Sequence, residues 1–257
     1  GSASINLENT DLLPGDYDLV VTSFNAFPYE TTVSVITPDG PYVTLDSYEI
    51  ISDVNSDFNS NGLADFDEHI AITLLANNVG VDDAHNVSAN VSIDDPYISL
   101  YVSNISFGDI SAGGSASATS NIEFDIAHNV PDGHSAEFTI LFFSDEDQWE
   151  GNFNVTIHAP VLTVSNPSFT DAGGDGVWDA GETINVVVLL NNEGSADHYM
   201  YPGVHLSENS NDASIAEGME FFWFYGIEAG TSVPANFTVT ASESANMGSE
   251  VTFTSQA

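Results

Sequence analysis

The sequence predicts an all-β protein made of tandem immunoglobulin-like β-sandwiches. Apolar and polar residues alternate with a period of two in many short runs, and clusters of Gly, Asn, Asp and Pro separate these runs. No segment combines a helical period with helix-capping residues. In addition, motifs from the middle of the chain recur in the same order near its end. Regularly spaced short strands with turn residues between them are typical of β-sandwiches.

Alternation places the expected strands along the chain. They cover residues 3–7, 17–24, 31–36, 70–75, 87–93, 138–143, 152–157 and 184–190. Residues 1–41 supply about three strands before a linker rich in Pro and Gly, and so few strands do not make an independent sandwich. We therefore interpret 1–41 as a partial Ig-like domain.

An internal repeat defines the next two domains. Residues 57–68 are echoed by 171–182, and the motif Asn-Asn-x-Gly at 77–80 recurs at 191–194. The segments 107–113 and 133–139 recur likewise at 224–230 and 248–254. These matches predict homologous sandwiches over 42–159 and 160–257. The second copy has no counterpart of 152–157, so we expect its last strand to be missing. Both ends of the chain are then expected to lie inside domains, which favours a fragment or strands completed by a neighbour.

Composition excludes several classes of function. The chain has no Lys or Arg, 39 Asp and Glu, and a formal net charge of -39. Nucleic-acid binding and attachment to anionic membranes both depend on basic side chains. The absence of Cys removes disulfides, thiolate nucleophiles and zinc-thiolate sites. No apolar run is long enough to insert into a membrane. Three explanations fit a stretch without Lys or Arg. The chain is a fragment between two sites cut by Lys/Arg-specific proteases, it comes from a protein selected to resist such proteases, or it reflects adaptation to salt.

The strongest chemical signal is an acidic loop at residues 57–68. It fits the pattern D-x-[DN]-x-[DN]-G-x5-E, in which alternate oxygens converge on a calcium ion and Gly62 allows the sharp bend. Hard Ca2+ prefers six to eight oxygen ligands of this kind. The predicted ligands are the side chains of Asp57, Asn59, Asn61, Asp65 and Glu68 and the backbone carbonyl of Leu63.

The repeat supplies a second loop of the same type. Its predicted ligands are Asp171, Asp175, Asp179 and Glu182, with the carbonyl of Val177. Gly173 replaces one side-chain ligand, so we expect weaker calcium binding there. Asp53 and Asn55 precede the first loop as additional candidate ligands. Because strands rather than helices flank both loops, the two ions are expected to be structural and not sensory.

Other constellations carry less information. The acidic segment 145–147 is expected to be a solvated strand connection, with a cation site as the alternative. The seven His residues lack metal-ligand spacing, and no catalytic arrangement is found. The aromatic run 221–225 either closes one end of a sandwich or forms a contact surface for another domain or subunit.

Several of these segments resemble a known family. Residues 14–29 and 35–43 resemble the end of the Ig-like domain that follows the catalytic domain of gingipain-type cysteine proteases. The loop 57–68, Asp95-Pro-Tyr97 and residues 130–134 resemble the CARDB-like β-sandwich modules that come after it in secreted relatives. The resemblance implies an extracellular or cell-surface location. The catalytic Cys and His of that family would lie upstream, so no catalytic role is carried over.

The sequence thus predicts non-catalytic, calcium-stabilised stalk or adhesion modules of a large secreted or cell-surface protein, resistant to Lys/Arg-specific proteases. The alternative is a subunit of an extracellular filament assembled by strand complementation between neighbours. Expected partners are other domains of the parent chain or neighbouring subunits, with a surface protein or a glycan as ligand.

Overall fold

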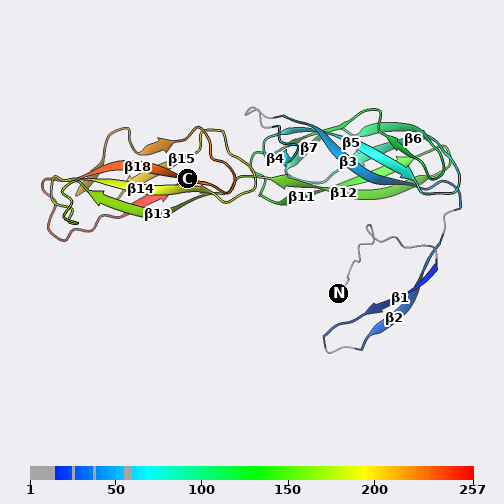
Figure 1. The fold of residues 1–257 in the computed structure, drawn as a ribbon, viewed down its shortest axis with the longest axis horizontal. Coiled ribbons are helices and arrows are strands. Elements are labelled where there is room, and N and C mark those ends of the chain that lie inside the picture. The colour runs from blue at the N-terminus through cyan, green and yellow to red at the C-terminus, as the bar shows by residue number, and fades with distance from the viewer. Residues whose placement is uncertain (1–14, 25–26, 37–38, 55–59) are drawn as a thin grey trace.

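The computed structural model describes residues 15–24, 27–36, 39–54 and 60–257, and its strands confirm the all-β prediction (Figure 1). No helix occurs in these residues, and consequently none that could cross a membrane. The predicted strand at 3–7 lies outside the described residues. Three parts follow one another along the chain: a hairpin and two sandwich-like units, which we call the first and the second sandwich.

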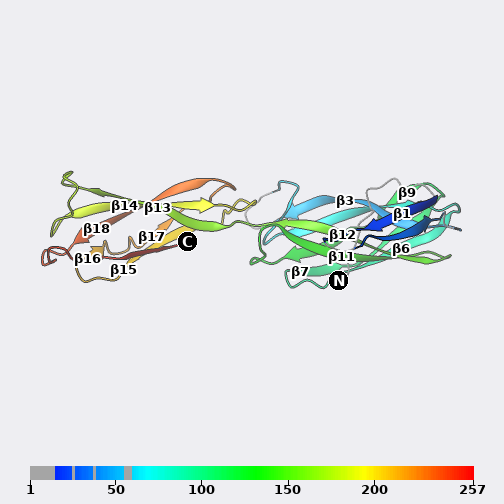
Figure 2. The same ribbon diagram turned by 90° about the horizontal axis from the view of Figure 1, so that it is seen from below.

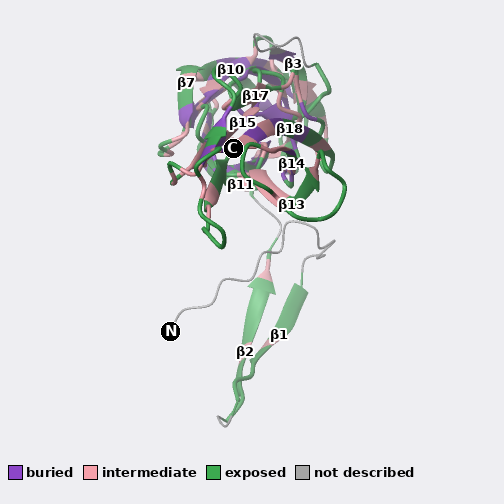
Figure 3. Ribbon diagram, turned by 90° about the vertical axis from the view of Figure 1, so that its left-hand side faces the viewer, coloured by how far each residue is buried: buried purple, intermediate pink, exposed green. Residues whose placement is uncertain are grey.

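The hairpin consists of β1 (Gly15–Val21) and β2 (Tyr29–Val35), which pair antiparallel. Its register places Tyr17 opposite Val33 and Val21 opposite Tyr29 on one face, whereas polar residues occupy most of the other face. All four of these side chains are exposed. The hairpin stands apart from both sandwiches (Figures 1 and 3). A hairpin with an uncovered apolar face is marginally stable on its own.

The first sandwich buries a core between two sheets. Its first sheet has the order β3-β5-β10-β7, with β9 also pairing with β5, and its second has the order β4-β12-β11-β6-β8. The strands are β3 (Val43–Val54), β4 (Ala64–Asp65), β5 (His69–Asn78), β6 (Ala84–Ser92), β7 (Ile98–Val102), β8 (Asn104–Ile110), β9 (Ser115–Ser117), β10 (Ile122–Ile126), β11 (His134–Phe143) and β12 (Gln148–His158). Phe138 lies at the centre, because its ring centroid is 5.1 Å from that of Phe124 and 5.0 Å from that of Phe153.

The second sandwich repeats this plan with fewer strands. The sheet β13-β14-β18-β16 corresponds to β3-β5-β10-β7, and β17-β15-β19 corresponds to β8-β6-β11. Figure 2 labels β13 to β18 of the second sandwich. The strands are β13 (Leu162–Asp171), β14 (Thr183–Asn192), β15 (Gly203–Glu208), β16 (Ala213–Ile215), β17 (Phe221–Trp223), β18 (Ser232–Ala241) and β19 (Phe253–Gln256). Phe237, Leu190 and Val204 are buried in its core. Among the described residues of this sandwich, no strand corresponds to β12.

The repeated Asn-Asn-x-Gly motif holds the linker at the start of each sandwich. In the first sandwich, Asn78 is fully buried, and its Oδ1 accepts hydrogen bonds from the N–H groups of Tyr42 and Gly80, both at 3.0 Å. Its Nδ2 donates to the carbonyls of Asp82 at 2.8 Å and Ile110 at 3.0 Å. All four hydrogen-bonding positions of this amide are therefore used.

Asn192 makes the same contacts in the second sandwich. Its Oδ1 accepts from the N–H groups of Val161 and Gly194, both at 3.1 Å, and its Nδ2 donates to Ala196 at 2.8 Å and Ile227 at 3.3 Å. The glycine is required because the linker crosses directly over it. A Cβ at Gly194 would lie 2.2 Å from the Ala159 carbonyl oxygen. The motif is thus a clamp that we call the linker clamp.

The two sandwiches contact each other directly at a joint. Ala196 of the second sandwich is buried in the hydrophobic core of the first. His158 Nδ1 lies 2.7 Å from Ser195 Oγ, and the Ser195 hydroxyl also donates to the carboxylate of Asp132. The ring of Phe66 lies 5.6 Å from that of His198. Apolar burial and hydrogen bonds at one place favour a fixed joint over a free hinge.

Candidate metal centres

The two acidic loops occupy equivalent places in the fold. The first connects β3 to β5 and the second connects β13 to β14. Asp57 and Asn59, two of the predicted ligands, and the additional candidate Asn55 lie outside the described residues. The predicted residues that the structure does describe can be compared between the loops one by one.

The second loop is organised by carboxylates that accept backbone N–H groups. Asp171 accepts from Gly174 at 2.8 Å and from Gly176 at 2.6 Å. Asp175 accepts from Val177 at 2.9 Å. Glu182 accepts from Gly173 through one oxygen at 2.5 Å and from Asp179 through the other at 3.0 Å. The Asp and Glu side chains thus replace the backbone partners that this irregular segment lacks.

The first loop repeats these bonds. Asn61 accepts from Leu63 at 2.7 Å, as Asp175 does from Val177. Glu68 accepts from Asp65 at 2.9 Å, as Glu182 does from Asp179. Gly62 and Gly176 have φ angles of 81° and 82°, a left-handed conformation that glycine adopts without strain. The structure therefore brings Asn61, Leu63, Asp65 and Glu68 into the same relation as Asp175, Val177, Asp179 and Glu182.

The residue that matches Asp171 is Asp53. Asp53 accepts the Gly62 N–H at 2.7 Å, as Asp171 accepts that of Gly176. Both aspartates also lie at the same register near the end of a strand, Asp53 of β3 opposite Ile70 and Asp171 of β13 opposite Ile184. The sequence alignment had placed Asp57 opposite Asp171, because the first loop is longer and its extra residues include an Asp that satisfies the motif. Only the strand pairing shows that Asp171 should be aligned with Asp53 and not with Asp57.

The acidic side chains of the two loops differ in how far they are buried. Asp53, Asp65 and Glu68 are only 5%, 1% and 1% exposed, whereas Asp175 and Asp179 of the second loop are exposed. Burial, together with repulsion from the Asp65 and Asp53 carboxylates, raises the pKa of Glu68 to about 7. Burial also raises the pKa of Asp65, with Asp197 across the joint adding to the effect. The first loop therefore gathers carboxyl groups where burial disfavours their charged form.

In the two loops, the carboxylates of Asp53, Glu68, Asp171, Asp175 and Glu182 accept backbone N–H groups. Within these residues, no three Asp, Glu or His side chains are gathered closely enough to hold a metal ion. The donors offered by both loops are nevertheless all oxygens, from carboxylates and one amide, which is the donor set of Ca2+ or Mg2+ and not of Zn2+ or copper. The chemistry of the loops fits a hard cation.

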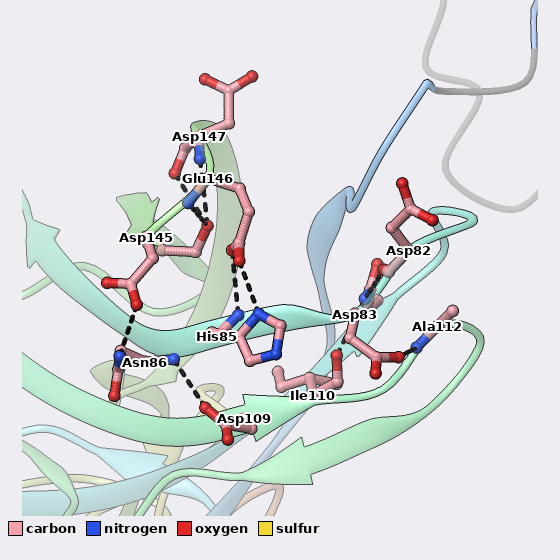
Figure 4. Close-up of polar contacts among 12 residues, drawn as sticks. Asp82, Asp83, His85, Asn86, Asp109, Ile110, Ala112, Asp145, Glu146 and Asp147 are labelled. Atoms are coloured by element: carbon pink, nitrogen blue, oxygen red, sulfur yellow. Dashed lines mark hydrogen bonds and ion pairs between the residues drawn. The ribbon is translucent and has the colours of Figure 1, made fainter.

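The acidic segment 145–147 is bound to the start of β6 (Figure 4). The Glu146 carboxylate accepts the backbone N–H of His85 at 3.0 Å and lies 2.6 Å from His85 Nδ1, and Asp145 accepts from Asn86 at 2.7 Å. The His85 backbone and ring together lower the pKa of Glu146 to about 2, and the pKa of His85 is raised by the same pairing. Sequence reasoning missed this contact because the partners lie far apart in the chain. The segment acts as a clasp between strands.

Histidines provide the only side-chain cations in the chain, and three of them lie against carboxylates within the part of the chain that the structure describes. Besides His85 with Glu146, His69 Nδ1 lies 2.6 Å from Asp125, and His134 Nε2 lies 2.7 Å from Asp95. These pairs are separate from the two loops. They provide local charge compensation elsewhere on the first sandwich when the imidazoles are protonated.

No protein-family model and no curated protein matches this chain. The candidate function therefore rests on the sequence and on the geometry described above.

Proposed function

We propose that this chain is a non-catalytic, calcium-stabilised stalk or adhesion region of a large secreted or cell-surface protein, with a gingipain-type protease as one candidate parent. The observation that carries the proposal is the match between the two loops. The same hydrogen bonds, the same left-handed glycine and the same three acidic positions recur where β3 leads into β5 and where β13 leads into β14. Chance Asp-rich turns would not share a geometry of this detail.

Calcium would add positive charge to a chain that is strongly acidic. The chain has a formal net charge of -39, no Lys or Arg, and seven His as its only side-chain cations. In the first loop, Asp53, Asn61, Asp65 and Glu68 would hold the ion, together with Asp57, Asn59 and the Leu63 carbonyl. In the second loop, the candidates are Asp171, Asp175, Asp179, Glu182 and the Val177 carbonyl. Binding of a divalent cation stabilises the folded state by mass action.

The position of the first loop supports a mechanical role. Phe66, within this loop, donates its N–H to the His158 carbonyl at 2.8 Å and packs against His198 of the second sandwich. An ion bound by Asp65 and Glu68 would therefore brace the joint as well as the loop. The absence of Lys and Arg leaves trypsin-like proteases no cleavage site in such a stalk.

Calcium titration tests the proposal. After chelation and dialysis, isothermal titration calorimetry with Ca2+ is expected to show two binding events per chain. The first loop should bind more tightly, because it offers more side-chain oxygens and is more buried. Mg2+ should bind more weakly, since it demands an octahedral site. Absence of heat, together with an unchanged melting temperature in calcium, would rule the proposal out.

One observation favours the filament as a second candidate function. In the first sandwich β11 pairs with β12, but β19 pairs only with β15 among the described residues. A groove of about 640 Å3 lies between β13 and β19, lined by Phe169, Trp178 and Phe253 among others. A strand donated by a neighbouring copy would occupy the place of β12 and cover this apolar surface. Electron microscopy distinguishes the candidates: fibres with a regular axial repeat support the filament, and dispersed monomers exclude it.

A further inference from the structure

An exposed group of aromatic rings lies on the outer face of the second sandwich, where β15 and β17 pair. Phe221 and Trp223 are 52% and 62% exposed, and their rings are within 7° of parallel with centroids 5.6 Å apart. His205 of β15 stacks on Phe221 with centroids 4.4 Å apart. We call these three residues the aromatic platform.

The backbone beneath the platform is shaped for the indole ring. Gly203 pairs with Trp223, and a Cβ on Gly203 would lie 2.7 Å from an atom of that ring. The Trp223 ring therefore lies directly against the β15 backbone, which leaves its other side to solvent. Any residue but glycine at 203 would displace the ring.

The first sandwich shows that folding does not require these aromatics. There β6 and β8 pair as β15 and β17 do, with Ser88 opposite Ser106 and Asn90 opposite Asn104. These four polar residues occupy the places of Gly203, Trp223, His205 and Phe221. The inward residues match in character in both copies, since Ile105 and Phe107 correspond to Phe222 and Phe224, which pack on the second core. Only the outer face has changed from polar to aromatic.

A groove of about 470 Å3 borders the platform. Its lining includes Met200, Tyr201, Pro202 and Gln256 but no Asp or Glu, although the whole chain contains 39 of them. Tyr201 has a φ of 53°, an uncommon conformation for a residue other than Gly, Asn or Asp, and its ring lies 6.0 Å from that of Tyr225. Backbone strain of this kind concentrates at functional sites.

We propose that the aromatic platform binds a neutral polysaccharide by stacking sugar rings on the faces of Trp223 and Phe221. This inference rests on the proposed adhesion function and supplies the chemical class of its ligand. Aromatic faces carry a negative quadrupole, which attracts the C–H groups on the flat face of a pyranose ring. Hydroxyls of Tyr201 and Tyr225, the His205 imidazole and the Gln256 amide lie at the border, where they offer hydrogen bonds to sugar hydroxyls.

Charge decides between this ligand and its competitors. Aromatic rings by themselves also attract cations, but no Asp or Glu side chain lines the groove to hold a cationic ligand. An anionic glycan would be repelled by a net charge of -39. A neutral glycan has an apolar face that matches the aromatic platform and polar edges that can form hydrogen bonds. It carries no charge, so the negative charge of the chain does not repel it.

The test uses the whole chain with calcium present and two probes, cellohexaose and N-acetylchitohexaose, in isothermal titration calorimetry. At least one probe is expected to bind. The double variant Phe221→Asn and Trp223→Ser copies the residues of the first sandwich and should weaken binding tenfold or more. Tyr101→Ala is the matched control, because Tyr101 is also 62% exposed but lies on β7 of the first sandwich. Its affinity should equal that of the unaltered chain.

Three outcomes would overturn the inference: no binding of either probe, equal binding by the double variant, or equal losses in the double variant and the Tyr101→Ala control. Self-association that disappears in the double variant would also overturn it, since the platform would then be a protein contact. Calcium titration of the same samples separates this result from the proposed function. Normal calcium heats with no glycan binding would reject the platform alone.

Discussion

Replacing Glu68 by Gln is expected to change stability in opposite directions with and without calcium. In chelator at neutral pH, the substitution removes a buried negative charge that lies close to Asp65 and Asp53, while Oε1 can still accept the Asp65 N–H. We expect a gain of about 1–2 kcal/mol in the free energy of unfolding. In calcium, the same substitution removes the ligand that closes the site. We then expect a loss of about 2–4 kcal/mol, because calcium no longer stabilises the folded state by mass action.

Thermal unfolding of each variant in chelator and in millimolar calcium measures both effects. Asp67→Asn is the matched control, because Asp67 is exposed, its φ of 60° suits Asn, and its loss removes one charge without touching the cluster. It should change stability little in either condition. Glu182→Gln should show the calcium-dependent loss but little gain in chelator, since the second loop is more open. A Glu68→Gln effect of the same sign in both conditions would contradict a metal role for this loop.

Removing the linker clamp is expected to be the most damaging single change in either sandwich. Asn78→Ala would leave the N–H groups of Tyr42 and Gly80 and the carbonyls of Asp82 and Ile110 without the partner that they now share. A buried polar group that loses its partner costs about 1–3 kcal/mol. Allowing for water that enters the gap, we expect a loss of about 3–5 kcal/mol in the first sandwich. Asn192→Ala should do the same in the second.

Urea unfolding monitored by tryptophan fluorescence checks this prediction, since Trp149 reports on the first sandwich and Trp178 and Trp223 on the second. Asn77→Ala is the control on the neighbouring residue. The Asn77 amide makes one hydrogen bond to Asp46 at the surface, at 2.6 Å, so its removal should cost less than about 1 kcal/mol. If Asn78→Ala and Asn77→Ala lost equal stability, the proposed stabilising role of the linker clamp would be wrong.

The sequence alone was informative wherever the physics is local. Alternation of apolar and polar residues identified the strands at 70–75, 138–143 and 184–190, because one face of each strand must be buried. The repeated motifs marked equivalent places in two sandwiches, and Gly62 and Gly176 identified turns that only glycine adopts easily. In the run 221–225, alternation also required that alternate rings point to opposite faces, and the structure places Phe222 and Phe224 on the core.

Other features could not be read from local pattern. The motif indicated Asp57 as the residue equivalent to Asp171. In the structure, Asp53 is the residue at the equivalent strand register, and register rather than distance along the chain brings a side chain to the loop. The Asn-Asn-x-Gly motif was visible as a repeat, yet its role as a clamp depends on a linker that crosses Gly80 and Gly194. The pairing of His85 with Glu146 joins segments that are far apart in sequence.

The sequence by itself therefore determined the all-β class and the internal repeat. It also showed that the chain has no Lys or Arg and many carboxylate and amide oxygens. These features depend only on the period, composition and motif spacing of the chain. Tertiary structure decided which carboxylates are buried together, that Asp65 and Glu68 of the first loop are buried whereas Asp179 of the second is exposed, and which aromatic faces meet solvent. These depend on contacts between residues distant in the chain. Burial then determines how strongly each charge or ring interacts, and no local pattern contains that information.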